Sequence, residues 1–170
     1  PLAQYYLVGA KMIVPFKDRL LFIGAVVQAS TGGAIYLEDT VVYSQNGTAY
    51  YTASFPATKA SDVSLPTTQF TSLLVPENQT ATPSAYFEDQ TGFGGFISAG
   101  VDKPAITVAA NEDVLMIGFD PDLQTKLIYS GNDLVPFNFY LINSEYGSSS
   151  TFSSINLDKG VFTLGNRGIV

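Results

Sequence analysis

The sequence predicts an all-β fold, and three observations lead to this prediction. Short apolar runs rich in β-branched and aromatic residues recur along the chain, and Gly or Pro bounds most of them, which is typical of strands. Asn46-Gly47 follows one such run, and Asn-Gly is a strong hairpin signal because both central residues of a type I′ turn need a positive φ. No window of ten or more residues keeps a helical period with capping residues.

In chain order, the first strands are expected before residue 56. The apolar runs are residues 5–8 and 11–16, which Gly9 separates, then residues 18–24, which Gly24 closes, and residues 40–44. Residues 30–33 and 45–47 are expected to be turns, and residues 49–55 to continue extended.

Residues 56–83 have a different composition, rich in Thr, Ser, Pro and Ala, with one apolar patch at residues 70–75. We expect a long Thr/Ser/Pro-rich connection or a degenerate repeat, with Leu73-Leu74-Val75 as its one strand. Further strands are expected at residues 96–100, 106–109, 114–118, 126–130 and 161–165.

Three of the expected strands end in glycine and resemble one another. They read Leu20-Leu21-Phe22-Ile23-Gly24, Val114-Leu115-Met116-Ile117-Gly118 and Val161-Phe162-Thr163-Leu164-Gly165, with the glycines 94 and then 47 residues apart. A period near 47 is that of propeller-like repeats, in which each blade is a four-stranded antiparallel sheet. The alternative is a β-sandwich or barrel without true repetition. A middle copy would place a glycine near position 71, where Thr71 stands, so that repeat is degenerate or replaced.

The domain organisation that follows is one all-β region over residues 1–170. At this period the chain holds about three to four blades, whereas propellers typically close with about 4–8. Pro1 and the apolar terminus Gly168-Ile169-Val170 look like cut ends. We therefore expect a fragment of a longer chain.

Composition excludes several classes of chemistry. The chain has no Cys and no His, which removes thiolate chemistry, the commonest general base and the commonest metal ligand. Its net charge is −7 with eight basic residues, which argues against a nucleic-acid-binding face and against an anionic membrane surface. Its longest apolar run, residues 20–27, is far shorter than the ~20 residues of a membrane-spanning helix, so no membrane anchor is expected in this sequence. Charged residues are only 14% of the chain, which suggests that a partner covers part of the surface.

Acidic residues offer the nearest candidates for catalysis. They occur as the adjacent pairs Glu38-Asp39, Glu88-Asp89 and Glu112-Asp113. Neighbours on a strand point to opposite faces, so only pairs from different strands could converge as a glycosidase acid and nucleophile. The preferred interpretation is that they are solvated turn residues, and no catalytic residue is assigned.

Other polar motifs are also interpreted as ordinary structure. Asp120-Pro121-Asp122 with Asn132 and Asp133 could offer oxygens to Ca²⁺, but the glycine and terminal Glu of a calcium loop are missing, so a plain turn is preferred. We assign no metal and no cofactor. Asn46-Gly47-Thr48 and Asn78-Gln79-Thr80 fit the glycosylation sequon, which often occurs by chance. Arg19 and Arg167 flank core strands and are expected to pair with internal carboxylates and fix strand register.

The Gly-Phe-Gly-Gly-Phe stretch is the one aromatic motif. Phe87, Phe93 and Phe96 lie among Gly92, Gly94 and Gly95, which fits either an exposed aromatic loop for a protein or sugar partner or ordinary core packing.

Several motifs together resemble the tail nozzle (tail tubular) and tail-stabilising proteins of short-tailed bacteriophages. The resemblance covers residues 15–55 and 112–170. It rests on Asp18-Arg19-Leu20-Leu21-Phe22-Ile23-Gly24, on Val42-Tyr43-Ser44-Gln45-Asn46-Gly47 with a following aromatic, and on Gly160-Val161-Phe162-Thr163-Leu164-Gly165. It implies a structural virion protein without catalysis, located in the tail. Its partners would be other copies in a ring, possibly sixfold, and neighbouring tail or portal proteins, with DNA as passing cargo.

The first hypothesis is therefore a structural subunit of a phage tail or portal-proximal ring. The alternative is a carbohydrate-binding or adhesin β module, in which Tyr and Phe side chains stack on sugar rings, although the chain has no Trp. A glycosidase that uses the acidic pairs is the third hypothesis.

Overall fold

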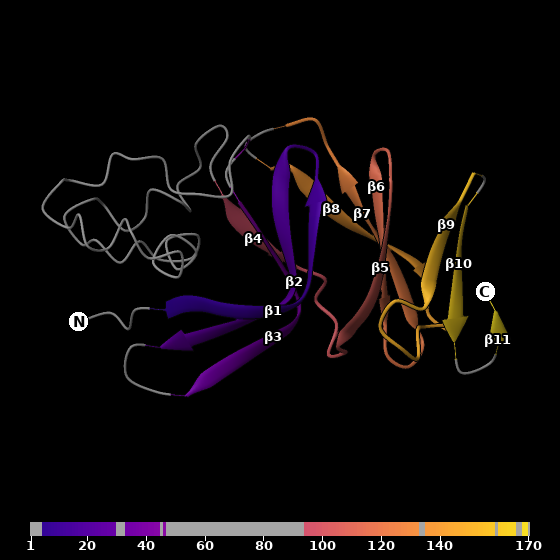
Figure 1. Ribbon diagram of the computed structural model, residues 1–170, viewed down its shortest axis with the longest axis horizontal. Coiled ribbons are helices and arrows are strands. Elements are labelled where there is room, and N and C mark those ends of the chain that lie inside the picture. Colours follow the sequence, from indigo (N-terminus) through magenta and orange to yellow (C-terminus); the bar gives the residue numbers. More distant parts are fainter. Residues whose placement is uncertain are drawn as a thin grey trace, which may run out of the picture. The chain divides into compact units, whose positions relative to one another are not determined.

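The computed structural model describes residues 5–29, 33–44, 46, 94–132, 135–158, 160–165 and 168–169. These residues form strands and connections without a helix (Figure 1), which confirms the all-β prediction. The chain divides into two compact units, Pro1–Phe96 and Ile97–Val170. The predicted connection at residues 56–83, with its strand at residues 73–75, lies outside the described residues.

The described strands of the first unit belong to a four-stranded sheet in the order β1-β2-β3-β4, and the last of them runs across the unit boundary at residues 96–97. Its strands are β1 (Tyr5–Phe16), β2 (Arg19–Ala29), β3 (Ala34–Tyr43) and β4 (Gly95–Ser98). Strands β1 and β2 form an antiparallel hairpin closed by Lys17 and Asp18, which both have positive φ, 51° and 56°. This is the backbone of a type I′ turn, whose twist matches that of the strands.

Gly24 does not end a strand, contrary to the sequence prediction, because β2 continues to Ala29. Its φ of 62° is left-handed, and the pairing of β2 with β3 shifts register between Ile23 and Ala25. Glycine is needed at this bulge because other residues rarely adopt that φ. A Cβ at Gly24 would also lie 3.2 Å from Cδ of Lys11, whose ammonium group reaches Glu38 at 3.5 Å.

The end of the β2–β3 pair is fixed by Arg19 and Ser44. Arg19 is buried, and its Nη1 donates to the Ser44 carbonyl at 2.8 Å while the guanidinium lies over the Tyr43 ring. The Leu20 amide donates to Ser44 Oγ, and the Ser44 amide donates to the Leu20 carbonyl, both at 2.9 Å. These bonds extend the pairing one residue past β3. Arg19 thus joins β2 to the end of β3 through a backbone carbonyl, and its predicted pairing with an internal carboxylate stays a prediction.

The second unit contains a four-stranded antiparallel sheet in the order β5-β6-β7-β8. Its strands are β5 (Ala105–Asn111), β6 (Val114–Phe119), β7 (Leu123–Tyr129) and β8 (Phe137–Asn143). The apolar core lies on these strands, with Leu115, Ile117, Phe119, Leu127 and Phe137 each at most 1% exposed. Strand β8 was not predicted from the sequence.

A smaller three-stranded sheet in the order β11-β10-β9 completes the second unit (Figure 1). It consists of β9 (Ser154–Leu157), β10 (Gly160–Gly165) and β11 (Gly168–Ile169). Strand β9 packs beside β5, the edge strand of the larger sheet, and the Asn156 side-chain amide donates to the Ala110 carbonyl at 2.8 Å.

The strands that look alike in the sequence occupy comparable positions. Gly24 and Gly118 lie in the second strand of their four-stranded sheets, and Gly165 ends the central strand of the small sheet. Tyr43 and Tyr129 end the third strand of the two larger sheets. Both larger sheets are therefore four-stranded, with every pair antiparallel in the β5–β8 sheet and the β1–β2 and β2–β3 pairs antiparallel in the other.

Candidate assembly surface

The β9–β11 sheet exposes an apolar face to solvent. Alternate residues of a strand share a face, and the register pairs Phe162 with Ile155 and Leu164 with Ile169. These four side chains, together with Leu157, therefore form one face, which we call the outward face. Its members are Ile155 (63% exposed), Leu157 (49%), Phe162 (50%), Leu164 (51%) and Ile169 (73%).

The opposite face of the same sheet is mostly polar, with Val161 as its apolar member, and it is partly buried. Thr163 is only 1% exposed, and its hydroxyl lies 2.8 Å from Ser154 Oγ, the residue directly across in β9. Asn156, on this same face, bonds to the Ala110 carbonyl. A half-buried antiparallel sheet normally turns its apolar side toward the core. Here the arrangement is inverted.

Three glycines allow the loop before β9 to lie tightly against the larger sheet. A Cβ on Gly118 would overlap the Ser148 side chain, and a Cβ on Gly147 would overlap the backbone of Phe119. A Cβ on Gly165 would lie 2.7 Å from the Gly147 carbonyl oxygen. The chain therefore passes between β6 and β10 at backbone contact distance.

Backbone hydrogen bonds hold the loop in that position. The Ser148 amide donates to the Phe119 carbonyl at 3.2 Å, and the Ser149 amide donates to the Leu164 carbonyl at 3.3 Å. The small sheet is thus attached through hydrogen bonds, glycine contacts and its polar side. Among the described residues of the second unit, this attachment leaves the outward face uncovered.

Further apolar side chains are exposed on β8. Tyr140, Leu141 and Ile142 are 51%, 62% and 50% exposed, and β8 is the edge of its sheet opposite β5. Consecutive strand residues alternate between faces, so these three do not form one continuous patch. The outward face is consequently the more coherent apolar surface of the second unit.

The structure places the acidic pairs in different settings. Glu112 and Asp113 are the exposed two-residue turn between β5 and β6, since Asn111 pairs with Val114. Glu38 and Asp39 lie in β3, where Glu38 meets Lys11 and Asp39 Oδ1 accepts a hydrogen bond from the Thr40 hydroxyl at 3.1 Å. Glu88-Asp89 lies outside the described residues.

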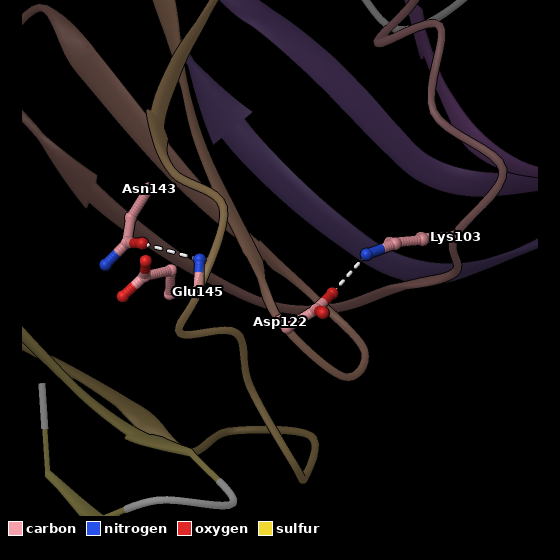
Figure 2. A network of polar contacts seen from close by, with 4 residues as sticks. All are labelled: Lys103, Asp122, Asn143 and Glu145. Atoms are coloured by element: carbon pink, nitrogen blue, oxygen red, sulfur yellow. Dashed lines mark hydrogen bonds and ion pairs between the residues drawn. The ribbon is translucent and has the colours of Figure 1, made fainter.

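The candidate calcium ligands are not brought together. Residues 120–122 connect β6 to β7, whereas Asn132 follows β7, so the two groups lie at opposite ends of a seven-residue strand, about 20 Å apart. Asp122 forms an ion pair with Lys103 (Figure 2). Asn143 Oδ1 accepts a hydrogen bond from the Glu145 amide at 2.7 Å, which shapes the turn after β8. Asp133 lies outside the described residues.

The structure describes only some residues of the remaining motifs. Asn46 is in an exposed turn, while Gly47, Thr48, Asn78 and Arg167 lie outside the described residues. Of the aromatic stretch, Gly95 is buried in β4, and a Cβ there would lie 2.7 Å from the Tyr43 hydroxyl. Phe96 is 61% exposed, and Phe87 and Phe93 lie outside the described part.

Among the described residues, Tyr43 has a shifted pKa. Burial raises the pKa of Tyr43 above its ordinary value of 10.0, and the positive charge of Arg19 lowers it part of the way back. The burial of Tyr43 and its contact with Arg19 both arise where β2 pairs with β3. We therefore interpret the shifted pKa as a consequence of this structural contact.

Among the described residues, no group of three or more acidic, His or Cys side chains is arranged so that it could hold a metal ion. The same residues form no helix with the length and apolarity to cross a membrane. Sequence reasoning missed the outward face, although the alternation of Ser154, Ile155, Asn156 and Leu157 was available as its signal.

A scan against protein-family models finds none that matches the chain, and a search of curated proteins finds no significant match.

Proposed function

We propose that the chain is a non-catalytic structural subunit of a bacteriophage tail or portal-proximal ring, located in the virion. In this role it acts by packing against other copies and against neighbouring tail or portal proteins. DNA is cargo that passes through the assembly. The net charge of −7 supports this part of the proposal, because an acidic surface does not retain phosphates.

The outward face is the observation that carries the proposal. At about 200 Å² for each fully exposed residue, the exposed fractions of these five residues correspond to roughly 600 Å² of surface in water, most of it apolar. This is at the upper end of the largest apolar patches on monomeric proteins, which reach about 300–600 Å², and such patches often mark interaction sites. A subunit that is buried in an assembly does not expose this surface.

The type of assembly is suggested by the resemblance to phage tail proteins. Its motifs fall on paired strands: residues 18–24 on the β1–β2 turn and β2, residues 42–43 on β3, and residues 160–165 on β10. Each larger sheet has four described strands that are neighbours in chain order, as the strands of a propeller blade are. We propose that these sheets are blades of a propeller-like ring component.

The test is the protein composition of virus particles. Particles are purified by density gradient from a lysate of the host that carries the gene, and peptides of this chain are quantified against the capsid protein by mass spectrometry. The proposal predicts that the chain co-purifies at a fixed small copy number per particle. Recovery only from the soluble fraction, together with hits on a glycan array, would support the sugar-binding alternative and contradict the proposal.

A further inference from the structure

The outward face has the properties of a self-complementary surface, which can pack against the same surface of a second copy. Its five residues are all uncharged, so two copies of an acidic chain can bring these faces together without apposing like charges. It is also formed by a sheet, and sheets stack well on sheets at about 10 Å with the strands near −30°. We propose that the outward face is covered by the outward face of a second copy of the chain.

The exposed area of the outward face is large enough for a contact with a second copy of the chain. Two outward faces of roughly 600 Å² each would bury about 1,200 Å² in total, which is the lower limit of stable specific interfaces. Polar residues at the rim add to this value. Packing of the outward face on the β8 residues would bury less, because Tyr140 and Leu141 point to opposite faces of their strand.

The contact is isologous, since the same residues are used on both copies. Phe162 lies on the central strand β10 and pairs with Ile155, so it is the expected anchor near the two-fold axis. Such a contact joins subunits in pairs, and other surfaces remain for the ring contacts. The inference rests on the proposed structural function for the claim that the covering partner is another subunit.

The experiment measures the mass of the full chain by sedimentation over nanomolar to micromolar concentrations. The unmodified chain is expected to be a dimer that dissociates on dilution. In the variant Ile155→Thr with Phe162→Thr, we expect the dissociation constant to rise by at least about a hundredfold, because each substitution acts on both sides of an isologous contact. Thr retains the preference for a strand, so the sheet should fold.

The matched control is Leu141→Thr on β8. Leu141 is as exposed as the residues of the outward face (62%) and also lies in a strand, but outside that face. This variant should dimerise like the unmodified chain. An unmodified chain that is monomeric at all concentrations, or a face variant that dimerises normally, would overturn the inference.

Crosslinking provides a measurement that does not depend on weakening the contact. The chain contains no cysteine, so Leu164→Cys introduces a single thiol on the central strand of the outward face. A bismaleimide that spans about 10 Å, the separation of stacked sheets, should link two copies of this variant. It should not link Leu141→Cys, and equal crosslinking of both variants would contradict the inference.

These outcomes are separate from those of the particle experiment. A chain that dimerises through the outward face but never enters particles would refute the proposed virion role and leave the contact established. A chain that enters particles while the face variants do not alter its self-association would refute the contact alone.

Discussion

Replacing Gly118 by Ala should destabilise the second unit by overpacking. The new Cβ would overlap the Ser148 side chain and lie 2.9 Å from Cγ2 of Thr107, both of which are fully buried. In an unobstructed strand, Gly→Ala gains roughly 0.5–1 kcal/mol. Overpacking costs about 1–3 kcal/mol, and the overlap here involves a side chain held by its own backbone bond, so we expect a net loss of about 2 kcal/mol.

A second substitution tests the cause of that loss. Ser148→Gly removes the side chain that the new methyl group meets, and the Ser148 hydroxyl has no hydrogen-bond partner among the described residues. Alone, it should cost only the ordinary penalty of a glycine, about 0.5–1 kcal/mol. In the double variant at least about 1 kcal/mol of the Gly118→Ala loss should be recovered, which a double-mutant cycle measures.

The assay is urea denaturation followed by circular dichroism and tyrosine fluorescence. Gly160→Ala is the matched control, because nothing lies within 4 Å of a Cβ at that position in β10. It should be neutral or slightly stabilising. If Gly118→Ala unfolds at the same urea concentration as the unmodified chain, or if the double variant is no more stable than Gly118→Ala, the close contact between loop and sheet is refuted.

Three further predictions concern other contacts. Gly24→Ala should lose about 1–2 kcal/mol because of its φ of 62°, whereas Gly33→Ala, with nothing within 4 Å, should be near neutral in the same denaturation assay. Because folding raises the pKa of Tyr43 above 10.0, its contribution to stability is complete below that pH and is lost as pH rises through the raised pKa. Tyr43→Phe should therefore show a smaller loss of stability in alkaline melts, and an unchanged loss would argue against this assignment. Lys103→Met should cost at most about 1 kcal/mol, because its ion pair with Asp122 is partly exposed; the difference from the unmodified chain should shrink in high salt, and a salt-independent loss would point to packing instead.

The sequence predicted the all-β class because strand composition and turn residues carry that information locally. It predicted β6 and β10 closely, since each is an apolar run between clear turn residues. Strand β7 begins at Leu123, three residues before the predicted run, because Gln124 and Thr125 interrupt the apolar pattern there. It missed β8 because three consecutive apolar residues, Tyr140, Leu141 and Ile142, are all exposed and break the alternation expected of a half-buried strand.

Glycine was the least informative residue for locating strand ends. The sequence treats Gly24 and Gly118 as equivalent terminators, but Gly24 forms a left-handed bulge within β2 and Gly118 makes room for Ser148. A glycine in a strand pattern can mark an end, a bulge or a close approach, and local sequence does not distinguish these.

The outward face could not be assigned from the pattern alone. Alternation in β9 and β10 shows that one face is apolar, and the usual expectation is that this face turns inward. The position of the small sheet is set by Gly147 and by the backbone bonds of Ser148 to β6 and of Ser149 to β10, and all of these contacts join residues distant in sequence.

Hydroxyl-radical footprinting of the outward face tests the central claim most directly. The oxidation rates of Phe162 and Leu164 are compared between the isolated, diluted chain and the purified assembly that contains it, with Leu141 as a reference. The account predicts strong oxidation of Phe162 and Leu164 in the diluted chain and protection of both in the assembly, because the face is covered by another subunit. Equal oxidation of these residues in both states would contradict the claim that the outward face is an assembly surface.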